Sequence, residues 1–143
     1  MKKALIVGLN KYPGCELACC SNDAVAMKEL IESNGDGSPN FDVVAITDSC
    51  TKKNLKIHIE KLFADDADIA LLYFSGHGAD CDGGYLCTTD FAEGDYGVRM
   101  TDVLETANKS HCKNKVIILD CCFAAKMGGV HIDLIIILCW EKE

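Results

Sequence analysis

Four short, almost continuously apolar runs alternate in this sequence with segments of helical periodicity, and this alternation restricts the fold more than any other feature. The apolar runs cover residues 4–10, 42–48, 68–78 and 115–120. The segments with apolar side chains at helical spacing cover residues 22–33, 51–66 and 100–109. Strands that are apolar throughout are typical of parallel sheets covered on both faces. We therefore expect an α/β fold of three layers, with a mostly parallel sheet between helices.

Local signals predict where the helices begin and end. Ser21 or Asn22 is expected to cap the first helix, and Gly35 to stop it. Thr51 is expected to cap the second helix and Thr101 the third.

The length of 143 residues suits one domain with its own core, so we expect a single domain over residues 1–143. The glycine-rich stretch around residues 83–91 predicts a small hairpin or an irregular loop. Residues 132–139 form a last apolar run and are a candidate fifth strand.

The net charge of −8 argues against nucleic acid as a partner, because phosphates require a basic face. The first residues lack the length of apolar run that a signal peptide needs. The apolar run at residues 134–140 is too short to span a bilayer. We expect a cytoplasmic protein with no membrane or nucleic-acid partner.

Ten cysteines are many for a chain of this size. In a cytoplasmic protein they are expected to be free thiols, mostly buried as small apolar residues. Structural zinc is less favoured, because no Cys-x-x-Cys pair is present and the adjacent pairs Cys19-Cys20 and Cys121-Cys122 tend to point in opposite directions.

Chemically active residues gather where the expected strands end. Ser75-Gly76-His77-Gly78 follows the third strand, and Asp120-Cys121-Cys122 follows the fourth. Asn22 and Asp23 open the first helix. Ligands of parallel sheets bind at the carboxyl ends of the strands, so we expect these groups at one edge.

A thiol and an imidazole on neighbouring strand ends are the components of a cysteine nucleophile. The imidazole takes the thiol proton or stabilises the thiolate, and the glycines beside His77 let backbone approach a substrate. The N–H groups of Gly78 and of the nucleophile are natural donors for an oxyanion hole.

Three ordered motifs resemble the caspase-type cysteine peptidases, and most closely their metacaspase and bacterial caspase-like branch. They are "YFSGHG" (73–78), "LDCC" (119–122) and "CSNDA" (20–24), and the resemblance extends from Lys3 to about Gly129. The histidine precedes the second cysteine of "LDCC" by 45 residues, close to the separation of about 50 in a caspase signature.

The resemblance implies a catalytic dyad of His77 and Cys122, with Cys121 as a neighbour of the nucleophile. It also implies that Asp23 and Asp120 line the S1 pocket and select a protein or peptide substrate with Arg or Lys at P1. Two carboxylates in a partly desolvated pocket favour a cation and repel an acidic side chain.

No cofactor is expected. Some metacaspases need calcium, and an acidic run after His77 leaves calcium open as an alternative, although it lacks ordered calcium-loop spacing. The run consists of Asp80, Asp82, Asp90 and Asp95.

Two departures from the family pattern follow the nucleophile. After the nucleophile the family commonly has His or Phe followed by Ser-Gly. This chain has Phe123 followed by Ala124 and Ala125. Only 21 residues follow Cys122, so we expect the domain to be short at its C-terminus and to lack the last strand or strands. An open sheet edge invites self-association or a completing partner chain.

These observations predict a cysteine endopeptidase that cleaves after Arg or Lys. The alternative is an inactive or truncated caspase-like binding module that needs a partner chain. A flavodoxin-like or receiver-like domain is a weaker third reading, because it would leave the Gly-His-Gly turn unexplained.

Overall fold

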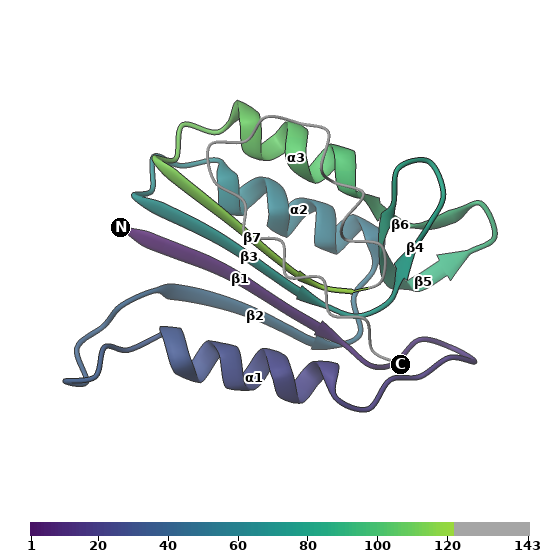
Figure 1. Ribbon diagram of the computed structural model, residues 1–143, viewed down its shortest axis with the longest axis horizontal. Helices are drawn as coiled ribbons and strands as arrows, with labels where there is room; N and C mark the ends of the chain where they lie inside the picture. Colours follow the sequence, from purple (N-terminus) through teal and green to yellow (C-terminus); the bar gives the residue numbers. More distant parts are fainter. Residues whose placement is uncertain (122–143) are drawn as a thin grey trace.

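A parallel four-stranded sheet forms the centre of the molecule (Figure 1). The computed structural model describes residues 1–121. The order in the sheet is β2-β1-β3-β7, and a smaller sheet has the order β4-β5-β6. The elements are β1 (Lys2–Leu9), α1 (Cys20–Ile31), β2 (Asp42–Asp48), α2 (Lys52–Phe63), β3 (Ile69–Ser75), β4 (Gly78–Ala79), β5 (Tyr85–Ala92), β6 (Asp95–Arg99), α3 (Met100–Lys109) and β7 (Asn114–Asp120).

Helices cover both faces of the large sheet. Helix α1 lies on one face, and α2 and α3 lie side by side on the other (Figure 1). The expected three-layer α/β fold with a parallel sheet is therefore confirmed. The candidate fifth strand at 132–139 lies outside the described residues.

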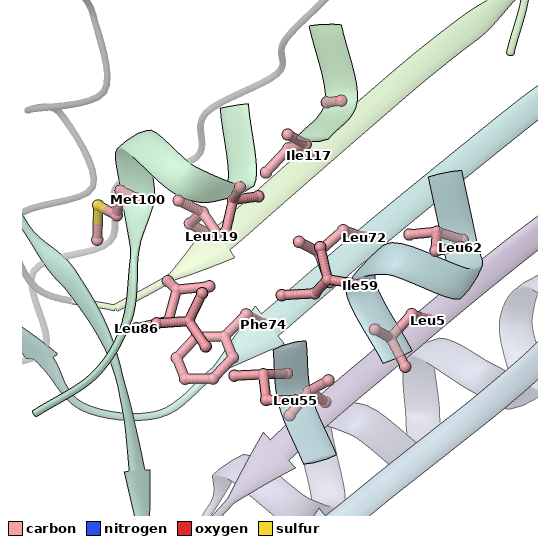
Figure 2. Close-up of a cluster of buried hydrophobic side chains, with 14 of the residues drawn as sticks. Leu5, Leu55, Ile59, Leu62, Leu72, Phe74, Leu86, Met100, Ile117 and Leu119 are labelled. Atoms are coloured by element: carbon pink, nitrogen blue, oxygen red, sulfur yellow. The ribbon is translucent and has the colours of Figure 1, made fainter. Parts of the chain in front are cut away.

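The central strands β1 and β3 are largely apolar because their side chains alternate between two cores. On β1, Leu5, Val7 and Leu9 belong to the larger core beneath α2 and α3. Ala4 and Ile6 belong to the smaller core beneath α1. Figure 2 shows the larger core, where leucines and isoleucines of the strands and α2 meet Phe74, Leu86 and Met100.

The expected hairpin is present and extends the molecule beyond the ends of the large strands. Strands β5 and β6 pair antiparallel, and β4 adds two residues to the other edge of β5. Because β4 begins three residues after β3 ends, this small sheet is attached directly to the carboxyl edge of the large one.

One helix cap was predicted correctly and two were wrong. The Thr51 hydroxyl accepts a hydrogen bond from the Asn54 amide at the start of α2. Helix α1 instead begins after Cys19 without a side-chain cap at that position, and α3 begins after Arg99, so Thr101 lies inside it. The expected stop at Gly35 was also wrong, because α1 ends at Ile31.

Asn10 performs the capping role that the sequence assigned to Ser21 or Asn22. Its side-chain oxygen accepts hydrogen bonds from the amides of Cys20 (2.9 Å) and Ser21 (3.3 Å). The Ser21 hydroxyl is used elsewhere and donates to Asp48 at 2.8 Å. A residue at the end of β1 therefore satisfies the first amides of α1, which would otherwise lack partners.

The eight cysteines within residues 1–121 are free thiols, as expected, and five of them are buried. The buried ones are Cys20, Cys50, Cys87, Cys112 and Cys121. Burial raises the pKa of the Cys50 thiol to about 11, and the negative charge of Asp90 adds to the effect. Such thiols are packing residues rather than nucleophiles. No helix within residues 1–121 is long and apolar enough to cross a membrane.

The capping arrangement makes a stability prediction. Asn10→Ala should lower the free energy of unfolding by about 1–2 kcal/mol, because it removes the acceptor of two helix amides. Asn22→Ala, a change at an exposed position of the same helix, should stay within about 0.5 kcal/mol. Urea unfolding of the three proteins measures this, and equal losses in the two variants would contradict the assignment of the cap.

Candidate active site

The parallel register brings the candidate residues to one edge of the sheet. Ser75, the last residue of β3, pairs with Asp120, the last residue of β7, and also with Gly8 of β1. His77 is the second residue after Ser75, and Cys122 is the second residue after Asp120. Cys122 itself lies outside the described residues.

The backbone of His77 is fixed on both sides. Its carbonyl accepts a hydrogen bond from the Cys87 amide at 2.9 Å, which ties it to β5. Its amide donates to the Tyr12 hydroxyl at 3.1 Å. The residue therefore has a defined position although it lies in a turn between β3 and β4.

The imidazole of His77 has a defined orientation as well. Its Nε2 atom lies 2.7 Å from the carbonyl oxygen of Cys15. A carbonyl oxygen can only accept, so this bond places the proton on Nε2 and leaves Nδ1 without one in the neutral ring. Nδ1 is then available to take a proton from a nucleophile.

A tight turn presents the Cys15 carbonyl to His77. Residues 12–15 read Tyr-Pro-Gly-Cys, and the Cys15 amide donates to the Tyr12 carbonyl at 3.1 Å. Gly14 has φ +78°, the left-handed conformation that a type II turn requires at its third position. Pro13 occupies the second position of the turn, where its ring fixes the φ angle that the turn needs.

The two candidate S1 carboxylates lie on the same face of the sheet. Leu119 packs in the core beneath α2 and α3, so Asp120 points to the opposite face, which α1 covers. The Ser75 hydroxyl donates to the Asp120 carboxylate at 3.3 Å. Asp23 lies in the first turn of α1 and is half-buried.

Gly78, the candidate oxyanion donor, belongs to β4 and pairs with Leu86. The bond from the Cys87 amide to the His77 carbonyl makes Gly78 and Leu86 a non-hydrogen-bonded pair of the antiparallel ladder. The N–H of Gly78 therefore points away from β5.

Cys121 is 3% exposed and belongs to the larger core. This agrees with the expectation that Cys121 is a packed neighbour of the candidate nucleophile. The catalytic role that the resemblance implies for Cys122 stays a prediction, because that residue lies outside the described residues.

The acidic run after His77 is divided among separate partners. Asp82 lies 3.9 Å from Arg99, and Asp95 lies 2.8 Å from Lys52. Asp90 accepts hydrogen bonds from the Thr88 hydroxyl and the Lys52 amide. Within residues 1–121, no group of three or more His, Cys, Asp or Glu side chains could hold a metal ion.

A hollow of about 230 Å³ lies elsewhere, between the first residues of β1 and β2 and the last turns of α2. Lys3, Asp42 and Lys61 border it. It is at the amino ends of the strands, so it is not part of the edge that carries His77 and Asp120.

Comparison with known proteins identifies the class of protein that this fold and edge belong to. The model of the caspase domain matches residues 1–134. The chain therefore belongs to the caspase-domain family of cysteine-type peptidases. It is also similar to metacaspase-4 of Arabidopsis thaliana, with 38% identity over 86 residues. That match covers 54% of this chain and 20% of the relative, so the chain spans only a small part of the relative's length.

Three residues that hold α1 and His77 in place were not predicted from the sequence: Asn10, Tyr12 and Cys15. The only local signal was the Pro-Gly turn between Tyr12 and Cys15. The contacts themselves reach residues far along the chain, such as His77 and Cys87, and no local pattern marks them.

The turn at Gly14 generates a prediction. Gly14→Ala and Gly37→Ala place a side chain at φ +78° and +84°, in both cases with open space around the new Cβ. Each should therefore lower the free energy of unfolding by about 1–2 kcal/mol. Only Gly14→Ala should also shift the imidazole NMR resonances of His77, because only that turn carries the Cys15 carbonyl. Unchanged His77 resonances in Gly14→Ala would contradict this role of the turn.

Proposed function

We propose that this chain is a cysteine endopeptidase in which His77 and Cys122 form the catalytic dyad. The observation that supports the proposal is the register of β3 and β7, which pairs Ser75 with Asp120 at the carboxyl ends of the strands. His77 is the second residue after Ser75, and Cys122 is the second residue after Asp120. The fixed orientation of the His77 ring, with Nδ1 left to accept a proton, supports the same role.

The proposed reaction proceeds in two steps. The Cys122 thiolate attacks the scissile carbonyl carbon, and His77, holding the thiol proton, donates it to the departing amine. The amide N–H of Gly78 and that of Cys122 stabilise the oxyanion that forms. Water, deprotonated by His77, then hydrolyses the thioester and regenerates the thiol.

We propose that the substrate is a protein or peptide with Arg or Lys at P1. Asp23 and Asp120 would bind its cationic side chain, and their position on the α1 face of the sheet supports a shared pocket. A hydrogen bond between charged partners contributes about 1.5–3 kcal/mol.

The dyad as proposed requires no cofactor. Calcium dependence is the alternative, and activity with and without a chelator would test it. A cytoplasmic location is also proposed, and the free thiols of residues 1–121 support a reducing compartment. Among those residues β2 and β7 are the outer strands of the large sheet. Self-association or a partner chain at such an edge is proposed on that ground.

The nucleophile assignment predicts different effects for the two adjacent cysteines. Cys122→Ala should abolish cleavage of a fluorogenic peptide ending in Arg. Cys121→Ala is the matched control and should retain most of the activity, because it removes only a buried packing group. Loss of activity in Cys121→Ala with activity kept in Cys122→Ala would reverse the assignment. No turnover by folded wild-type protein would favour a binding module instead.

The S1 assignment predicts a loss of specificity. Asp23→Asn and Asp120→Asn should each lower kcat/KM for the Arg peptide roughly thirtyfold, the equivalent of about 2 kcal/mol. Asp42→Asn, an exposed change at the opposite edge, should leave it unchanged. Steady-state kinetics with Arg, Lys and Asp peptides measure this, and preferential cleavage after Asp would contradict the proposal.

A further inference from the structure

Tyr12 is a buried polar side chain that the proposed mechanism does not use. The residue is completely buried, although it lies in the loop between β1 and α1. Its ring packs edge-on against the His77 imidazole, with 4.5 Å between the ring centroids and 67° between the planes. On another side the ring lies 6.3 Å from that of Phe91.

The Tyr12 hydroxyl joins two backbone groups, one in the turn between β3 and β4 and one in β5. It donates to the Cys87 carbonyl at 2.8 Å and accepts from the His77 amide at 3.1 Å. Both bonds use the single proton and one lone pair of the phenol, so the donor and acceptor directions are fixed. The hydroxyl therefore connects the turn that carries His77 to β5.

The neighbouring backbone leaves room for this hydroxyl and for little else. A Cβ atom on Gly76 would lie 2.3 Å from the Tyr12 oxygen. Real Cβ atoms do not make contacts at that distance. A residue with a side chain at position 76 would therefore clash with the Tyr12 hydroxyl in its present position. The glycine of the Gly-His-Gly turn thus has a structural reason in this chain.

We infer that Tyr12 is a positioning residue for His77, acting through two contacts that fix the histidine's backbone and its ring. The inference rests on the proposed function, in which His77 assists Cys122. The backbone contact is the hydrogen bond from the His77 amide, and the ring contact is the edge-on packing. The Cys15 carbonyl, two residues after Pro13 in the same turn, fixes the Nε2 end of the imidazole.

The protonation state of Tyr12 suits this role. Burial raises the pKa of the phenol far above its usual value, and the hydrogen bond from His77 offsets only part of that effect. The hydroxyl therefore keeps its proton at neutral pH and can donate it to the Cys87 carbonyl.

Tyr12→Phe is the direct test, because it keeps the ring and removes the hydroxyl. The His77 amide and the Cys87 carbonyl then lose their partner in a buried place, and the histidine turn shifts. A misplacement of about 1 Å at a catalytic group can lower a rate a hundredfold. We expect kcat for the Arg peptide to fall about tenfold to a hundredfold. KM should stay within about twofold, since Asp23 and Asp120 are untouched.

Tyr85→Phe is the matched control. Tyr85 is also a buried tyrosine, and its hydroxyl accepts a hydrogen bond from Arg99 Nε at 3.2 Å. The change removes one tyrosine hydroxyl without touching His77, so kcat and KM should both remain near the wild-type values.

The turnover must be expressed per competent site, because Tyr12→Phe could lower the folded fraction. Titration with an Arg chloromethyl ketone, which alkylates the nucleophile, counts these sites. A lower kcat per titrated site with unchanged KM supports the inference. Fewer titrated sites with unchanged kcat per site would mark a purely structural role and overturn it. No cleavage by the wild-type chain would overturn the proposed function, and the inference with it.

Discussion

The parallel register of β1, β3 and β7 is the constraint on which the rest of the structure depends. It aligns Gly8, Ser75 and Asp120 at the carboxyl ends of three neighbouring strands. Both faces of the sheet are apolar and covered, so a slip of one residue would exchange the two cores and turn Asp120 away from α1. The cores therefore fix the register, and the register fixes which polar residues meet at the edge.

The loop between β1 and α1 connects the end of the sheet to His77 through hydrogen bonds. Asp48, with φ +68°, directs its carbonyl to the amides of Asn10 and Lys11, at 3.2 and 3.0 Å. Asn10 in turn caps α1 and, through its carbonyl, binds the amides of Tyr12 and Leu17. Asp23, Tyr12 and the turn that meets His77 are thus all attached to the ends of β1 and β2. The same loop between β1 and α1 therefore holds both the start of α1 and His77.

The layers, the parallel sheet and the edge that carries His77 and Asp120 could be predicted from sequence. Short apolar runs that end in glycine or polar residues predict strands directly. The bounds of β2 were predicted to the residue, although this outer strand is exposed or half-buried along its length. The caps of α1 and α3 were wrong because local preference for Ser, Asn or Thr yields to a partner from another element. Tyr12 was missed because its partner Cys87 lies 75 residues away, and a single tyrosine in a loop gives no local sign of burial.

The central claim is that His77 and Cys122 act as a pair, and the pH dependence of Cys122 alkylation tests it most directly. Iodoacetamide labelling, followed by mass spectrometry of the peptide that contains Cys122, gives the rate at each pH. A free thiol has a pKa of about 8.5. The account predicts rapid labelling well below that pH in the wild-type protein, and a shift of the profile toward the free-thiol value in His77→Ala. Identical profiles in the two proteins would contradict it.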